Sequence, residues 1–209
     1  MTRVLIIDSA ATGDASVSRK LTDAAAEAIR RRNPAARITR RDIGAEPIPH
    51  LTWETVPAVR AGIVESGTAR EALALSDALV GELQEADFLV LGAPMYNFGM
   101  PSTLKAWFDH VLRAGITFRY GESGPEGLLK GRKALVVETR GGLYSEGPAA
   151  GLDSQEPHLR TLLGFMGIDD VTFVRAEKLA FGPEAAAAAV AEAVGKIEEL
   201  AEAELPLAA

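Results

Sequence analysis

Residues 87–102 read DFLVLGAPMYNFGMPS, and this stretch decides the fold. Its first part, Asp87–Ala93, is a nearly continuous apolar run, which is typical of a strand covered by helices on both faces. Its second part places two prolines and a glycine among large apolar side chains, so we expect an irregular turn directly after the strand. A buried strand that ends in a shaped turn indicates an open α/β sheet, in which ligands bind at the carboxyl ends of the strands.

Similar runs on either side extend this pattern to the whole chain. They predict four more strands, over Arg3–Asp8, Arg37–Asp42, Lys133–Thr139 and Asp170–Ala176. Apolar residues at three- and four-residue spacing predict helices between them, over Ser18–Arg32, Ala69–Glu85, Ser102–Arg113, Glu156–Met166 and Glu184–Ala203. The alternation predicts an α/β fold with a doubly wound, five-stranded parallel sheet and helices on both faces. A length of 209 residues favours a single domain over 1–209.

Two segments are surplus to a minimal fold of this kind. Gly44–Gly67 contains three prolines, and Gly115–Gly131 contains Phe118 and Tyr120 beside several glycines. Both retain large apolar residues, so we expect ordered excursions over the sheet edge that shape a pocket or a contact between subunits.

Composition excludes several classes of function. The chain has 22 basic and 29 acidic residues, and its net charge of −7 would repel nucleic acid and anionic membranes. It has no cysteine, which excludes disulfides, thiolate catalysis and cysteine metal sites. The three histidines, His50, His110 and His158, lack metal-ligand spacing, so we expect no metal. No stretch approaches the roughly 18 apolar residues of a membrane span, so we expect a cytoplasmic protein.

The loop after the first strand is small and rich in hydroxyl groups. It reads SAATGDASVSR over residues 9–19 and opens the first predicted helix. Hydroxyls and amides at a helix start bind anions, so Ser9, Ser16 and Ser18 are candidates for holding a phosphate. The alternative is that Ser16 only caps the helix. The loop contains neither G-x-G-x-x-G nor G-K-[ST], so a Rossmann dinucleotide site or a P-loop is not expected.

The turn after the third strand suits a flat, aromatic ligand. Met95, Tyr96 and Phe98 offer surfaces for a tricyclic ring, and Asn97 with the backbone amides could bond its polar edge. The alternative is that these side chains simply fill the core. After the fourth strand, Thr139-Arg140-Gly141-Gly142 offers paired glycines that can take positive φ and bring N–H groups close to a ligand. A plain glycine turn is the alternative there.

Together these segments resemble one known family, the FMN-dependent NADH-azoreductases, which are flavodoxin-like homodimers also active on quinones. The resemblance runs nearly from end to end and is most specific in the Met95–Phe98 segment and in Phe118-Arg119-Tyr120. Its other parts are Arg41-Asp42-Ile43, Ile48-Pro49, Glu71–Asp77, Leu104-Lys105, Ala114-Gly115, Gly124–Leu128, Arg140-Gly141-Gly142 and Leu163-Gly164-Phe165.

The resemblance implies roles for particular residues. The FMN phosphate would be held by Ser9, Ser16, Val17 and Ser18. The isoalloxazine would be lined by Pro94, Met95, Tyr96, Asn97 and Phe98, and its pyrimidine side by Thr139, Arg140, Gly141 and Gly142. The substrate slot would be bordered by Phe118, Tyr120 and Tyr144, with the first two reaching toward the neighbouring subunit's flavin. The alternative for Phe118 and Tyr120 is that they pack their segment onto its own domain. No catalytic side chain is expected, because the chemistry takes place at N5 of FMN.

The implied reaction has two steps at one site. NADH or NADPH delivers hydride to flavin N5 and leaves, and a quinone or azo compound then takes the reducing equivalents. The preferred nucleotide stays open, with Arg60, Arg140 and Arg175 as unplaced candidates for contacting the extra phosphate of NADPH. One alternative function is a flavodoxin-type electron carrier without a small-molecule substrate, and another is a flavin-free structural protein.

Overall fold

The predicted parallel sheet forms the centre of the molecule. A computed structural model describes residues 1–122 and 124–204. Five parallel strands lie in the order β2-β1-β3-β6-β7, which is a doubly wound, flavodoxin-like order. Their bounds are β1 (Arg3–Asp8), β2 (Arg37–Asp42), β3 (Phe88–Pro94), β6 (Lys133–Thr139) and β7 (Asp170–Ala176). The five predicted strands are confirmed, with β3 shifted by one residue.

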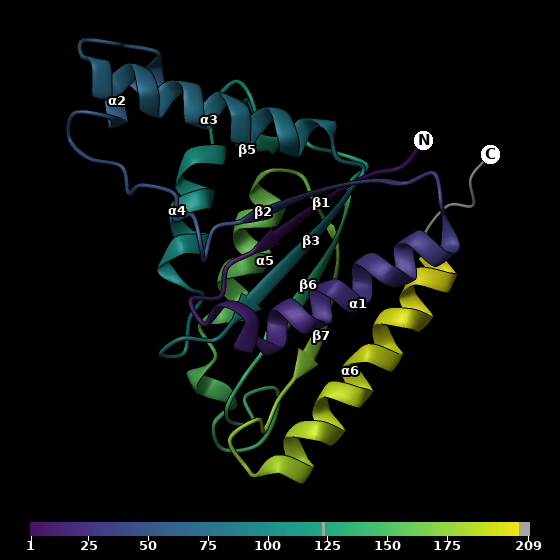
Figure 1. The fold of residues 1–209 in the computed structure, drawn as a ribbon. Coiled ribbons are helices and arrows are strands. Elements are labelled where there is room, and N and C mark those ends of the chain that lie inside the picture. The colour runs from purple at the N-terminus through teal and green to yellow at the C-terminus, as the bar shows by residue number, and fades with distance from the viewer. Residues whose placement is uncertain (123, 205–209) are drawn as a thin grey trace.

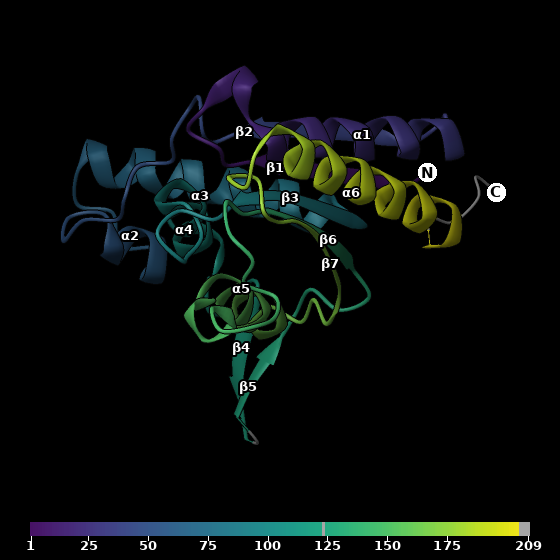
Figure 2. The ribbon, with the colours of Figure 1, turned by 90° about the horizontal axis from the view of Figure 1, so that it is seen from below.

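Helices cover both faces of the sheet, as Figure 2 shows. On one face lie α1 (Val17–Arg32) and α6 (Pro183–Glu204), which pack against each other and against β3 and β7. On the other lie α3 (Gly67–Glu85), α4 (Ser102–Val111) and α5 (Gln155–Phe165). Short 3-10 turns, η1 (Gly13–Ala15) and η2 (Ala150–Leu152), interrupt two of the loops. No helix among the described residues has the length and hydropathy of a membrane span.

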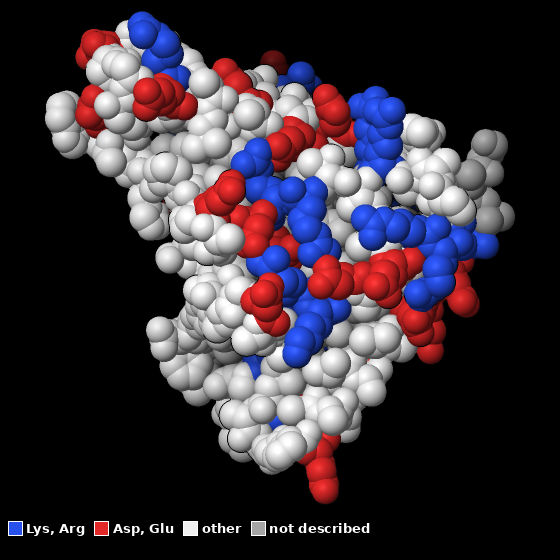
Figure 3. Space-filling view, in the orientation of Figure 1, with Lys and Arg blue, Asp and Glu red and all other residues white. Residues whose placement is uncertain are grey.

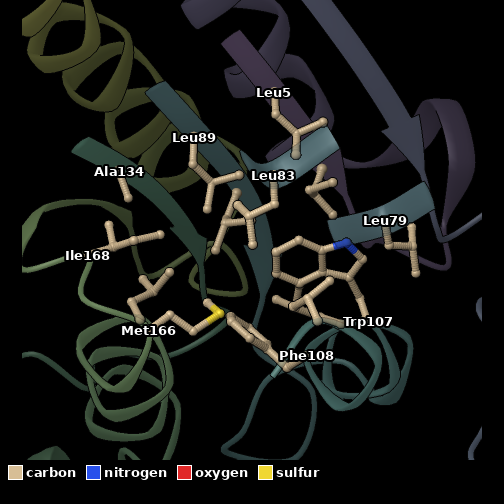
Figure 4. Packing of buried hydrophobic residues seen from close by; sticks show 14 of the residues in the cluster. Leu5, Leu79, Leu83, Leu89, Trp107, Phe108, Ala134, Met166 and Ile168 are labelled. Atoms are coloured by element: carbon tan, nitrogen blue, oxygen red, sulfur yellow. The ribbon is translucent and has the colours of Figure 1, made fainter. Parts of the chain in front are cut away.

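Alternation along each inner strand produces two separate cores. Leu5 and Ile7 of β1 face α3, α4 and α5, while Val4 and Ile6 face α1 and α6. Figure 4 shows the first core, where Leu79 and Leu83 of α3 and Trp107 and Phe108 of α4 meet Leu5 and Leu89. Each large side chain buried there contributes about 1.5–3 kcal/mol to folding. These cores hold the carboxyl ends of the strands in a fixed register.

Strand β2 departs from the expected continuous apolar pattern. It lies at the edge of the sheet and carries Arg37, Arg40 and Arg41. Arg40 pairs with Asp23 and Asp8, and Arg41 pairs with Glu82. Figure 3 accordingly shows basic and acidic side chains interspersed over β2 and α1. Charges on an edge strand oppose the addition of a foreign strand, which explains why this position is polar.

The two surplus segments are ordered, as expected, but the second lies differently from what the sequence indicated. The first contains α2 (Val56–Ala61), which packs against α3. The second forms an antiparallel hairpin of β4 (Phe118–Gly121) and β5 (Gly124–Gly127). Figure 2 shows this hairpin projecting beyond α5, away from the sheet, so it does not lie over the sheet edge as expected. A Cβ at Gly127 would lie 2.0 Å from the Gly167 nitrogen, so the base of the hairpin touches the backbone that follows α5.

Candidate functional site

The loops after β1, β3 and β6 lie at one end of the sheet, because the carboxyl ends of parallel strands share an edge (Figure 1). The described residues join these loops directly by hydrogen bonds. The Met95 N–H donates to the Thr139 carbonyl at 2.9 Å, and the Thr103 hydroxyl donates to the Ser9 carbonyl at 3.0 Å. The sequence prediction that these three loops form one site is consistent with this arrangement.

The loop after β1 ends in two buried hydroxyls at the start of α1. Ser16 is the N-cap, and its Oγ accepts a hydrogen bond from the Arg19 N–H at 3.2 Å. The Oγ atoms of Ser16 and Ser18 lie 3.0 Å apart, and both residues are at most 3% exposed. The amides of the first helical turn lack partners within the helix, so an anion at this point would meet N–H and O–H donors together. Val17 is the first residue of α1, and its expected contact with a phosphate stays a prediction.

Ser9 has a different environment from Ser16 and Ser18. It is fully buried, and its hydroxyl donates to the Gly92 carbonyl at 2.6 Å. This bond joins the end of β1 to β3 and leaves the oxygen of Ser9 only as an acceptor. The structure therefore gives Ser9 a clear role in fixing the loop, and its expected contact with a phosphate stays a prediction.

Sequence reasoning missed the contribution of Gly44 to this loop. A Cβ at Gly44 would lie 2.0 Å from the Ala10 carbonyl oxygen, so only glycine fits where the chain leaves β2 and passes the loop after β1. The Gly44 N–H also donates to the Asp8 carbonyl at 3.2 Å. The only sign of this role in the sequence was a glycine placed just after a predicted strand. The sequence could not show that Ala10 is the residue that Gly44 approaches in space.

The loop after β3 forms a tight reverse turn with two bulky residues in left-handed conformation. Tyr96 and Gly99 exchange backbone hydrogen bonds of 2.9 and 3.1 Å, while Asn97 and Phe98 have φ of 49° and 71°. Positive φ at both central positions defines a type I′ turn, which asparagine adopts readily and which strains phenylalanine. The turn leaves the Tyr96 and Phe98 residues 36% and 45% exposed. Strain that presents an apolar ring to solvent points to a binding role and rules out the alternative that these rings fill the core.

Hydrogen bonds fix both ends of this turn. Pro94, the last residue of β3, is buried, and the Phe98 carbonyl accepts a hydrogen bond from the Ser154 N–H at 3.0 Å. The Tyr96 hydroxyl accepts one from the Ala11 N–H at 3.1 Å. The exposed rings are therefore held against the loops on either side.

The glycine pair after β6 does not adopt the expected backbone conformation. Neither Gly141 nor Gly142 has positive φ, so that prediction is wrong. Gly142 has another use: a Cβ there would lie 3.0 Å from atoms of the Tyr144 ring, so a larger residue would crowd that ring. The Tyr144 ring in turn meets Phe98 edge to face, with centroids 6.0 Å apart. Gly142 thus leaves room for a tyrosine beside the turn after β3.

The Arg140 side chain points into the protein. It is fully buried and forms ion pairs with Glu138, Asp153 and Glu177 at 2.7, 2.9 and 3.2 Å. It therefore cannot contact the extra phosphate of NADPH, and that expectation is wrong. The backbone N–H of Arg140 donates to the Ala176 carbonyl at 2.9 Å. Both the guanidinium and the backbone N–H are thus engaged within the protein, and neither supports the predicted contact of Arg140 with a ligand.

Glu138 is the most perturbed acid in this cluster. Burial raises the pKa of Glu138 to about 7, with Glu156 acting in the same direction and Arg140 opposing. Its Oε1 atom is buried and has no hydrogen-bond partner among the residues that the structure describes. Glu138, which directly precedes Thr139 in the chain, thus has a carboxyl group with a pKa near neutral pH.

The three expected slot residues do not come together within one chain. Tyr144 lies beside Phe98, as described above. Phe118 is 6% exposed and packs on Phe165 of α5 and on Tyr120, with centroids 4.6 and 5.6 Å apart. Phe118 therefore packs the hairpin onto its own α5, which was the alternative role. Tyr120 is 74% exposed on the hairpin, and its role in a slot stays a prediction.

The histidines are spread across the fold. His110 is buried in α4, where burial lowers its pKa and its Nε2 lies 3.0 Å from the Pro49 carbonyl oxygen. Across residues 1–122 and 124–204, no three histidine, aspartate or glutamate side chains come together as ligands for a metal ion.

Comparison with known proteins agrees with this geometry. Residues 2–201 match a family model described as "Flavodoxin-like fold". The FMN-dependent NADH:quinone oxidoreductase of Hyphomonas neptunium is 53% identical over 202 residues, covering 97% of each chain. The azoreductase of Bacillus anthracis str. Sterne superposes with a TM-score of 0.88 at 28% identity, over 96% of this chain and 99% of that one. An FMN-dependent NADH-azoreductase from Bacillus anthracis str. Ames Ancestor, solved in complex with FMN, has a TM-score of 0.85 at 26% identity, over 96% of this chain and 100% of that one.

Proposed function

We infer the function from one premise: the chain belongs to the flavodoxin-like family that contains the FMN-dependent NADH:quinone oxidoreductases and the azoreductases. It is an FMN-dependent enzyme that uses NADH to reduce quinones and azo compounds. The structural observation that supports this function best is the type I′ turn after β3, which presents Tyr96 and Phe98 at the carboxyl edge of the sheet.

The residues at this edge fit the parts of FMN. The buried hydroxyls of Ser16 and Ser18, at a helix start, suit the phosphate, and a site without lysine is sufficient because the helix dipole favours the negative charge. The exposed rings of Tyr96 and Phe98 suit the apolar face of the isoalloxazine. When bound, FMN supplies the two-electron chemistry that links the nicotinamide nucleotide to the acceptor.

The protein's own contribution is position and exclusion of water. The three loops are held to one another by backbone hydrogen bonds, so they offer a fixed surface to a flat ligand. Phe98 and Tyr144 meet edge to face and give that surface an aromatic border, against which a flat acceptor can pack. The border favours flat, conjugated acceptors such as quinones and azo dyes.

A homodimer of single-domain subunits in the cytoplasm completes the proposal. The hairpin projects beyond α5 and carries the exposed Tyr120, which is the kind of element that reaches a neighbouring subunit. A second copy would give the hairpin a partner and bring Tyr120 near the other subunit's site. A cytoplasmic location agrees with the use of NADH, which cells produce and oxidise there.

An electron carrier without a small-molecule substrate is the less favoured function. Such a carrier needs an exposed flavin edge and does not need the projecting hairpin or the aromatic pair of Phe98 and Tyr144. The relatives that cover nearly the whole chain are named as oxidoreductases.

Anaerobic stopped-flow absorbance tests the function. The FMN-reconstituted protein is mixed first with NADH, with NADPH in a parallel series, and then with a benzoquinone or an azo dye. We expect rapid bleaching of the flavin by NADH and complete reoxidation by either acceptor. Bound flavin that neither nucleotide reduces would contradict the oxidoreductase function and favour the electron-carrier function.

A further inference from the structure

We propose that Glu177 is a positioning residue that holds Tyr144 over Gly142 and thereby sets which acceptors reach the site, an inference that rests on the proposed function. Glu177 follows β7 and lies more than thirty positions from Tyr144 in the sequence. Among the described residues, the hydrogen bonds and ion pairs of its side chain go to Arg140, Tyr144 and Ser145, which all follow β6. Its effect on the reaction would therefore act through Tyr144.

The Glu177 carboxylate binds the turn that carries Tyr144 at three points. Its Oε1 accepts hydrogen bonds from the N–H groups of Tyr144 and Ser145 at 2.8 and 3.0 Å. Its Oε2 accepts one from the Ser145 hydroxyl. Hydrogen bonds to an ionised carboxylate are about twice as strong as neutral ones, so this group closes the turn firmly.

Buried Arg140 keeps that carboxylate charged and in place. Arg140 Nη1 lies 3.2 Å from Glu177 Oε1, and the guanidinium is itself fixed by Glu138 and Asp153. Burial would raise the pKa of Glu177, but the hydrogen bonds from Ser145, Tyr144 and Arg140 hold it below its usual value. Glu177 is therefore an anion at neutral pH, anchored to the interior of the protein.

A different set of contacts supports the residues nearer the strand. Backbone bonds connect residues 140–142 to residues 176–180: Arg140 N–H to the Ala176 carbonyl, and the N–H groups of Lys178, Leu179 and Ala180 to the carbonyls of Gly142, Arg140 and Gly141. None of these bonds uses the Glu177 side chain. Removing that side chain should therefore release Tyr144 and Ser145 while the backbone of residues 140–142 stays in place.

Release of Tyr144 would change the aromatic border of the site. Its ring now packs on Gly142 and meets Phe98 edge to face, so it limits the space between the two loops. A freed tyrosine would allow bulkier acceptors to approach and would hold small ones less well. The ratio of activity on a two-ring azo dye to activity on benzoquinone should thus rise, with little change in FMN affinity.

The first test needs no cofactor and no turnover. Hydrogen–deuterium exchange of the apo protein is measured over residues 143–149 in wild type, Glu177→Ala and Glu177→Gln, with the exposed acid Glu184→Gln as matched control. Loss of a hydrogen bond worth about 1 kcal/mol corresponds to roughly five-fold faster exchange. We expect at least that increase in Glu177→Ala, a smaller one in Glu177→Gln, and none in the control. Unchanged exchange in Glu177→Ala would overturn the proposal.

The second test asks whether Glu177 acts through Tyr144. In Glu177→Ala we expect the azo-to-benzoquinone ratio of kcat/KM to rise about five-fold, the effect of one lost hydrogen bond, with the Kd for FMN within two-fold. In a Tyr144→Ala background the same substitution should have no further effect on the ratio. Additive effects, or an FMN affinity that falls as much as the ratio rises, would overturn the proposal.

A second variant and a separate activity readout distinguish a folding defect from failure of the proposal. If Glu177→Ala fails to fold, Ser145→Ala removes one of the three donors from an exposed residue, and it should raise exchange over 143–149 and the acceptor ratio in the same direction. Failure of the proposed function would show separately, as wild-type protein with bound FMN that does not oxidise NADH, while the exchange result would still report on Glu177.

Discussion

The Tyr96 hydroxyl accepts a hydrogen bond from the Ala11 N–H at 3.1 Å, so the turn after β3 is tied to the loop after β1. These two loops are expected to bind different parts of FMN, the ring and the phosphate. One side chain therefore couples the two halves of the proposed cofactor site.

Tyr96→Phe should weaken FMN binding more than riboflavin binding. The substitution keeps the ring and removes only the acceptor for Ala11, which contributes about 0.5–1.5 kcal/mol, or roughly a three- to ten-fold rise in Kd. The loop after β1 is proposed to hold the phosphate, which riboflavin lacks. Fluorescence titration with both flavins checks this, and an equal loss for the two would contradict the coupling.

Ser18→Ala and Ser16→Ala should separate phosphate binding from helix stability. Both remove a buried hydroxyl, but only Ser16 caps α1. Loss of the cap should lower the free energy of unfolding by about 1 kcal/mol in Ser16→Ala, with little change in Ser18→Ala. Both variants should lose about ten-fold or more in FMN affinity, since each removes a hydrogen bond to a charged group. Urea unfolding of the apo proteins and FMN titrations provide the two readouts, and a Ser18→Ala variant that binds FMN normally would remove Ser18 from the site.

Phe98→Gly should be more stable than Phe98→Ala. Both variants lack the ring and its contact with Tyr144, so they differ only in backbone freedom. At a φ of 71°, alanine is strained by about 1–2 kcal/mol, whereas glycine is not. Urea unfolding compares them. The reverse order, which is usual where φ is negative, would show that the turn is not left-handed.

Glu138→Gln should change how stability depends on pH. Burial raises the pKa of Glu138 from 4.5 to about 7 in the folded protein. The folded state then binds more protons than the unfolded state between these values, so the stability from this group is complete below pH 4.5 and is lost as pH rises through 7. Relative to Glu138→Gln, wild type should lose about 1–3 kcal/mol between pH 4.5 and pH 8. Urea unfolding at both values tests it, and parallel behaviour of the two proteins would contradict the raised pKa.

Much of the fold could be predicted because it depends on local patterns. The inner strands are six or seven residues long with continuous apolar centres, VLII in β1 and ALVV in β6, and their alternation with amphipathic helices is visible in the sequence. The hairpin was missed because β5 reads GPEG, without apolar alternation, and its position depends on contact between Gly127 and Gly167. Contacts between residues so far apart leave no periodic mark in the sequence.

The sequence by itself determined the parallel sheet, the loops that form the site and the residue types that suit a phosphate and a flat ring. Only the tertiary structure decided how those residues are used. It turned Arg140 inward to Glu138, packed Phe118 on α5, and brought Glu177 to the turn that carries Tyr144. The physical reason is that local propensity and periodicity act over a few residues, whereas buried charges must find partners wherever the fold brings them.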